Sequence, residues 1–427
     1  MRERPIIADM VNKQFLPKMF KVRQIFPRPQ IRPEAIPGVI DELLSVDKFE
    51  SQIKPGMKIA ITAGSRGVAN IEIVTRALVD FVKKQGASPF IVPSMGSHGG
   101  ATAEGQTEIL ESFDITEETM GCPIVSSMET VKIGVNEEGV DVHIDKHAQE
   151  SDGIIVVGRI KPHTCFRAPF ESGVMKMIAI GLGKQYGAEL LHETGFKNLG
   201  KSVPMFGKVI IENSPVLFGV GLIENAFDET CKIAVMNADE IEVQEPPLLQ
   251  EAFANMPQIL VDECDVLIVD QIGKNFSGDG MDPNITGTFV SEYASGGIVS
   301  QSVCILDLSD ETHGNAIGIG VAHATTKRAF DKVELAKMYP NAITSTVVEG
   351  VKIPMIMESD KEAIQVCVKI CNEIDKQNPR IVRIPNSLHL EYIWLSESYY
   401  EEAKQNPRLV IESEPAEFAF DVDGNLW

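Results

Sequence analysis

The chain has 427 residues, of which 44% are hydrophobic and 23% charged. This composition is typical of globular domains and excludes a disordered, collagen-like or coiled-coil chain. The length allows two or three domains, which can bury large cores without disulfides or a structural metal. Lys and Arg number 39 against 61 Asp and Glu, a formal net charge of −22, so we expect the protein to repel nucleic acids and anionic membrane surfaces.

The seven cysteines are scattered and include no Cys-x-x-Cys pair. Their spacing therefore predicts neither a disulfide framework nor a zinc ribbon. The N-terminus lacks the apolar core of a signal peptide, and no apolar run approaches the ~20 residues of a membrane span. We expect a cytoplasmic protein.

Strand and helix patterns alternate along the chain. The first forty-odd residues are rich in proline and predict an extended arm. The next elements are predicted as follows: strands at 58–62, 89–93, 140–144, 153–160, 216–222 and 232–235, and helices at 71–84, 172–181 and 184–194. The strand, helix and strand over 58–93 form a βαβ unit, in which the two strands are parallel.

A second group of elements follows the Pro-containing stretch 238–247, which predicts a domain junction or an inserted linker. Strands are expected at 265–270, 302–308 and 380–385, with a helix at 362–374. The fold class is α/β, two-lobed, with mostly parallel sheets flanked by helices. We expect domains over 1–255 and 256–427, with the active site at the carboxyl ends of strands between the lobes.

Glycine-containing loops follow four of the predicted strands. They are Gly64–Gly67, Ser94–Gly100, Lys161–His163 and Gly273–Gly280, and each carries a histidine or a cation. Glycines let backbone N–H groups approach an anion, while Arg or Lys supplies the opposite charge. Any one of these loops could be an ordinary solvated turn, but four together at one sheet edge predict a binding site.

Four residues stand out chemically. His98 and His163 lie in these loops, where imidazole suits proton transfer near neutral pH, although a single loop histidine is more often structural. Lys176 lies in the apolar run GVMKMIAI, where a lysine either extends its amine to the surface or serves a chemical role. His192 follows sixteen residues later and is unremarkable by itself.

The order Arg66, His98, Lys161-Pro162-His163, Ser172-Gly173-x-x-Lys176 and His192 resembles that of the nickel-dependent lactate racemase family. The resemblance covers about residues 55–200 and extends more loosely to the C-terminus. It implies a nickel-pincer nucleotide, a nicotinate-derived mononucleotide that carries nickel in an S–C–S pincer, and the proteins that mature this cofactor. It also implies a racemase or epimerase, that is, an isomerase, of 2-hydroxy carboxylic acids that works by reversible hydride transfer through a transient 2-keto acid.

By this resemblance, Lys176 would hold the cofactor through a thioamide bond and His192 would be the fourth nickel ligand. His98 and His163 would be the paired general acid/bases, one for each enantiomer. The remaining assignments are as follows: Arg66, Gly99 and Gly100 would contact the cofactor, and Arg66, Lys274 and Arg167 the substrate. The oligomeric state is left open, with a homo-oligomer as one option.

The sequence departs from the family pattern at several positions. Ala63 stands where the family has Asp, Gly67 replaces a proline, Gly99-Gly100 replaces Arg-Pro, and Met175 replaces an arginine. The loop after His163 is three residues longer and adds Arg167 and Glu171. These changes predict a 2-hydroxy acid other than lactate, larger or more polar.

Two alternatives use the same residues. The first is a zinc metallohydrolase with His98, His163 and His192 as ligands and a carboxylate from Asp279 or Asp282; the spacing of these histidines gives it little support. The second is a binding protein for a nucleotide or sugar acid that catalyses no reaction. Lys176 favours the racemase, because a hydrolase has no use for it.

Overall fold

The computed structural model describes residues 4–65 and 67–427. The chain forms two compact units, Arg28–Met256 and a second unit that joins Pro257–Trp427 to the segment ending at Pro27. Among the described residues, no helix combines the length and apolar character that crossing a membrane requires.

The unit Arg28–Met256 is built on a sheet whose described strands run in the order β3-β2-β6-β7-β8. These strands are β2 (Lys58–Ala63), β3 (Ser88–Pro93), β6 (Gly153–Arg159), β7 (Val216–Glu224) and β8 (Thr230–Asn237). β3, β2, β6 and β7 are parallel, and β8 is antiparallel to β7. A separate hairpin contains β4 (Thr130–Val135) and β5 (Asp141–Asp145).

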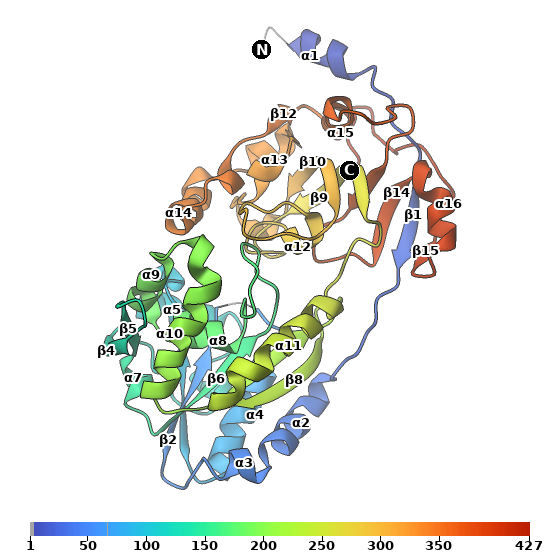
Figure 1. Ribbon diagram of the computed structural model, residues 1–427. Coiled ribbons are helices and arrows are strands. Elements are labelled where there is room, and N and C mark those ends of the chain that lie inside the picture. Colours follow the sequence, from blue (N-terminus) through green and yellow to red (C-terminus); the bar gives the residue numbers. More distant parts are fainter. Residues whose placement is uncertain (1–3, 66) are drawn as a thin grey trace. The chain divides into compact units, whose positions relative to one another are not determined.

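Helices cover both faces of this sheet, because its central strands are apolar on both sides. The helices are α2 (Ile36–Leu44), α3 (Asp47–Glu50), α4 (Ile71–Lys84), α5 (Ala103–Glu111), α6 (Glu117–Met120), α7 (Lys146–Gln149), α8 (Val174–Lys176), α9 (Lys184–His192), α10 (Leu199–Asn213) and α11 (Ile241–Asn255). One core contains α2 and α4 with Ile59 and Ile61 of β2, and the other contains α8 and α10 with Ala60 (Figure 1). The predicted βαβ unit is confirmed as β2-α4-β3.

The second unit contains a sheet whose described strands run in the order β12-β11-β10-β9-β13-β14-β1-β15. They are β1 (Met19–Gln24), β9 (Glu263–Ile272), β10 (Val299–Leu308), β11 (Ala324–Thr326), β12 (Met355–Met357), β13 (Ile381–Ile384), β14 (Tyr392–Ser396) and β15 (Leu409–Ile411). The strands from β12 to β13 are parallel, and the rest are antiparallel. The helices are α1 (Arg4–Val11), α12 (Pro283–Thr286), α13 (Lys327–Asp331), α14 (Leu335–Ser345), α15 (Asp360–Ile370) and α16 (Tyr400–Gln405). The predicted α/β class with mostly parallel sheets is confirmed.

The N-terminal segment differs from the expected extended arm. β1 pairs antiparallel with both β14 and β15, so strands near the other end of the chain supply the hydrogen-bond partners of its backbone. This pairing places the first residues in the second unit, whereas the predicted first domain, 1–255, included them. The predicted boundary after residue 255 lies beside the division between Met256 and Pro257.

The stretch 238–247 also differs from the predicted junction or linker. It forms the start of α11, which contains Pro246 and Pro247 inside the helix. Ile241, Glu245 and Leu249 of this helix are buried against the sheet. Burial of one face, rather than helix propensity, therefore stabilises α11.

Candidate active site

The predicted loops lie where an α/β sheet ordinarily binds ligands. From β2 the chain continues to β3 on one side, while β6 lies on the other side of β2, so the strand order reverses at β2. Ser65 follows β2, His98 follows β3 and His163 follows β6. Three neighbouring strand ends thus supply the predicted residues at the topological switch point.

His98 is exposed and lies immediately before the turn Gly99–Ala101. Its Nδ1 shares a hydrogen bond with the hydroxyl of Ser65. The buried Gln106 of α5 donates to the carbonyl oxygens of Gly96 (2.9 Å) and His98 (3.2 Å). A side chain of α5 therefore fixes the backbone of the loop that carries His98.

The amide of Gln106 belongs to a buried polar network under this loop. Lys184, at the start of α9, donates to the carbonyl of Pro93 and to Gln106 Oε1 (3.4 Å), and its ammonium lies 3.1 Å from Asp145 Oδ2. Both charged side chains are fully buried. Burial lowers the pKa of Lys184, and the charge of Asp145 opposes that shift.

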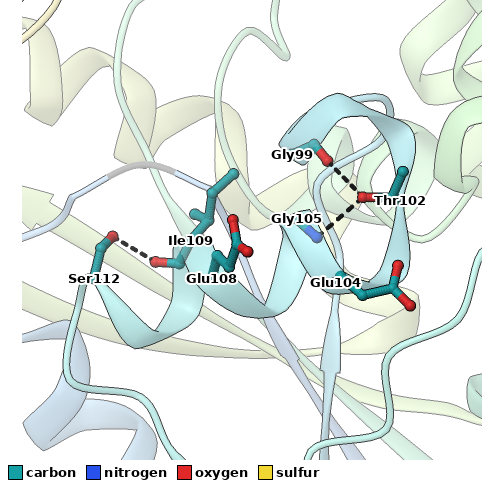
Figure 2. Close-up of a pocket in the computed structure, with 7 residues that line it drawn as sticks. All are labelled: Gly99, Thr102, Glu104, Gly105, Glu108, Ile109 and Ser112. Carbon is teal, nitrogen blue, oxygen red and sulfur yellow. Dashed lines mark hydrogen bonds between the residues drawn. The ribbon is translucent and has the colours of Figure 1, made fainter.

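Gly99 and Gly100 were predicted to contact the cofactor. Gly99 has a left-handed backbone (φ +67°), and a Cβ there would lie 2.6 Å from the backbone nitrogen of Gln106, so no other residue fits. Figure 2 shows a surface hollow beside Gly99, where Thr102 caps α5 and Glu104 and Glu108 contribute carboxylates. These two carboxylates disfavour a phosphate in the hollow itself, and the role of both glycines in cofactor binding stays a prediction.

His163 is partly buried at the start of a loop that folds onto it. The side chain of Glu171, 2% exposed, accepts hydrogen bonds from the backbone N–H of His163 (2.6 Å) and Ala168 (3.1 Å). Arg167 Nη1 donates to the His163 carbonyl (2.7 Å) and to Glu171 (3.3 Å). Arg167 thus bonds within its own loop, and its predicted contact with substrate stays a prediction.

Lys176 and His192 are brought together by α8, the following π-helix Met177–Gly181, and α9. Lys176 is the last residue of α8 and partly buried, and His192 is the last residue of α9 and exposed. The surrounding protein atoms and the nearby Lys176 charge lower the pKa of His192 to about 4. The Lys176 charge also acts on Glu171, so these three side chains share one neighbourhood.

Glu245 of α11 is a buried carboxylate that the sequence analysis missed. It accepts a hydrogen bond from the backbone N–H of Met175 (2.9 Å) and also bonds to that of Val174, at the start of α8. A Cβ on Gly173 would lie 1.9 Å from its Oε1. Glu245 therefore caps the helix that carries Lys176, and burial raises its pKa to about 7.

This pKa predicts a measurable pH dependence of folding. A carboxyl whose folded pKa is raised stabilises the fold below its unfolded pKa, and that stabilisation is lost as the pH rises through the folded value. For Glu245 we expect the free energy of unfolding to fall by about 3 kcal/mol between about pH 4.5 and 7. Urea unfolding of wild type and Glu245→Gln at several pH values measures this as the difference between their pH profiles, and parallel profiles would contradict it.

The four predicted loops do not share one sheet edge, because Gly273–Gly280 follows β9 in the sheet of the second unit. Two further predictions concern Arg66 and Lys274. Arg66 lies outside the described residues. Lys274 belongs to the second unit, where its Nζ donates to Asn341 Oδ1 (3.0 Å) and its backbone N–H to Thr312 (3.0 Å). The substrate contacts predicted for both stay predictions.

No protein-only metal centre is formed among the described residues, since no three His, Cys, Asp or Glu side chains are placed to hold an ion. The zinc site of the metallohydrolase alternative is therefore not assembled from His98, His163 and His192. A cofactor that carries most of the metal ligands itself would need fewer ligands from the protein. The pair Lys176 and His192, an amine beside an imidazole, fits such a cofactor.

The fold and these strand-end loops define an α/β protein with two histidines at the switch point of its first sheet. Residues 11–201 match the family model for the lactate racemase N-terminal domain. Over these residues the chain is similar to the lactate racemase family, and the predicted resemblance is confirmed.

Among solved structures, the chain is similar to the lactate racemase apoprotein from Thermoanaerobacterium thermosaccharolyticum. The TM-score is 0.53 at 14% sequence identity, and the match covers 86% of this chain and 94% of the other. At that identity the likeness shows a shared fold. No curated protein sequence matches this chain.

Proposed function

We propose that the protein is a racemase or epimerase of a 2-hydroxy carboxylic acid. The observation that carries the proposal is the convergence of Ser65, His98 and His163 at three adjacent strand ends, with Lys176 beside His192 in the same domain. All of these residues lie within 11–201, the stretch that matches the family model for the lactate racemase N-terminal domain. Inversion at C2 of a hydroxy acid requires proton transfer at the hydroxyl, which histidines near neutral pH can perform.

Lys176 and His192 are the residues that would hold a nickel-pincer nucleotide, Lys176 through its amine and His192 through its imidazole. When bound, that group supplies a reversible hydride acceptor, which imidazole cannot replace because the α-hydrogen is too weakly acidic to leave as a proton. His98 and His163 would take the hydroxyl proton and return it. The three-residue extension after His163 would be part of the site, which supports a substrate other than lactate.

The test is a chiral assay. The protein is produced together with the cofactor-maturation proteins and nickel, then incubated with single enantiomers of lactate, malate and phenyllactate and with single aldonate epimers. We expect conversion of at least one of them, measured by chiral chromatography, and none with a Lys176→Ala, His192→Ala double variant. Absence of conversion by the loaded protein would contradict this assignment over these substrates. Faster conversion of lactate than of the others would contradict the proposed substrate class.

A further inference from the structure

The loop between Lys161 and Ser172 forms a closed clasp. Backbone hydrogen bonds of 3.0 and 3.1 Å join these two residues across its base. Inside the clasp, the carboxylate of Glu171 accepts the N–H groups of His163 and Ala168. The extra residues by which this chain departs from its family pattern therefore fold back onto His163.

Every backbone polar group of His163 and one of its ring nitrogens are bonded within this clasp. Glu171 binds its N–H, and Arg167 binds its carbonyl oxygen. The backbone N–H of Cys165 donates to His163 Nδ1 at 3.0 Å, and the ring of Phe166 lies 4.4 Å from the imidazole. The orientation of the imidazole is therefore set by its own loop.

The bond from Cys165 also determines where the imidazole carries its proton. A backbone N–H can only donate, so Nδ1 must present its lone pair, and the neutral ring carries its proton on Nε2. A proton on Nδ1 would break this bond and place two N–H groups against each other. His98 is different, because the Ser65 hydroxyl at its Nδ1 can either donate or accept.

We propose that the clasp Lys161–Ser172 fixes neutral His163 in its Nε2–H form, so that it offers the substrate oxygen a hydrogen-bond donor. His98 is then the member of the pair that is ready to take and return the hydroxyl proton at Nε2. The inference rests on the proposed function for its catalytic meaning. The Nε2–H of neutral His163 donates a hydrogen bond to the substrate oxygen and keeps its proton, because losing that proton would leave an imidazolate. To accept a proton at Nε2, His163 must first move its own proton to Nδ1 and lose the Cys165 bond. Glu171 and Arg167 act as positioning residues, since they hold the backbone on which this bond depends.

Histidine tautomers can be measured directly in the full-length protein. We would record long-range ¹H–¹⁵N correlation spectra with ¹⁵N-labelled histidine at pH 8, and assign the His163 signals with His163→Gln. His323 is an internal reference, because the Val303 N–H donates to its Nδ1 at 3.1 Å. His143 is the contrasting case, since its Nδ1 faces the hydroxyl of Thr130 at 3.3 Å.

We expect the Nε2–H form of His163 to exceed the Nδ1–H form about tenfold, because a hydrogen bond would be exchanged for a repulsive contact. Glu171→Gln should reduce this excess about threefold or more, because an amide cannot accept both backbone N–H groups with its nitrogen. Glu117→Gln is the matched control, since Glu117 also accepts a backbone N–H, that of Ile124, in a different loop. If the Glu171→Gln variant does not fold, Arg167→Ala replaces it as the test, and the same reduction is expected.

A wild-type ratio near one, or a ratio that the Glu171 and Arg167 variants leave unchanged, would overturn the proposal. The spectra require neither nickel nor substrate. Failure of the chiral assay would therefore overturn the proposed function and leave the measured tautomer unaffected. A mixture of His163 tautomers would overturn the role of the clasp and leave the result of the chiral assay unaffected.

Discussion

Lys184→Met is expected to lower the free energy of unfolding by about 3–5 kcal/mol, the largest stability effect that we predict for a single substitution. Lys184 and Asp145 are 3.1 Å apart and fully buried. Removal of the ammonium leaves the Asp145 carboxylate buried without its counter-charge, and removes the bonds to Pro93 and Gln106. Urea unfolding followed by circular dichroism measures the loss.

Two controls separate this effect from loss of a lysine in general. Lys201 pairs with Glu138 on the surface, with side chains 67% and 45% exposed, so Lys201→Met should cost less than about 1 kcal/mol. The double variant Lys184→Met, Asp145→Asn removes both buried charges and should be less destabilised than Lys184→Met alone. Equal losses for Lys184→Met and Lys201→Met would show that the buried pair is not the cause.

His98→Ala and His163→Ala are each expected to slow turnover by about 10²–10⁴-fold, because each removes one of two acid/base groups. Initial rates of inversion, measured with the cofactor-loaded protein and each enantiomer separately, give the size of the effect. The affinity for the substrate should fall much less than the rate. A protein that only binds a nucleotide or sugar acid would show no turnover in the first place. Its double variant His98→Ala, His163→Ala would keep the affinity for that ligand.

His143→Ala is the matched control for these two variants. His143 lies on β5, outside the three strand-end loops, and its ring packs edge-on against Tyr186 at 4.7 Å. We expect its rate to stay within about twofold of wild type. If the His143 variant loses as much activity as the other two, a general structural effect would replace the acid/base explanation.

Local patterns predicted much of the first unit. The periodicity of 71–84 predicted α4 with the bounds the structure has, and the short apolar runs on either side predicted β2 and β3. β1 was missed because its residues, MFKVRQ, alternate apolar and polar side chains only in part. It becomes a strand by pairing with β14 and β15, almost 400 residues away in the sequence. No local signal encodes such a partner.

In the site too, some features were predictable from local patterns and others depend on residues distant in the sequence. The placement of His98 and His163 after parallel strands was predictable, because a strand end and a glycine-containing turn are local signals. Ser65 lay in a predicted loop, yet its bond to His98 depends on the order of strands in the sheet. Lys184 and Glu245 were missed because the charged or backbone groups that they bind, Asp145 and Pro93 for Lys184 and Met175 for Glu245, lie far away in the sequence. The burial of a charged side chain cannot be predicted from local sequence when its partner is distant along the chain.

Native mass spectrometry of the protein, produced with the maturation proteins and nickel, tests most directly whether it is a nickel-nucleotide isomerase. We expect an added mass equal to that of the nickel-pincer nucleotide in the wild type. That mass should be absent from the Lys176→Ala, His192→Ala double variant and retained in His143→Ala. A wild-type protein that carries no such mass, or carries only zinc, would contradict the proposed nickel-dependent function.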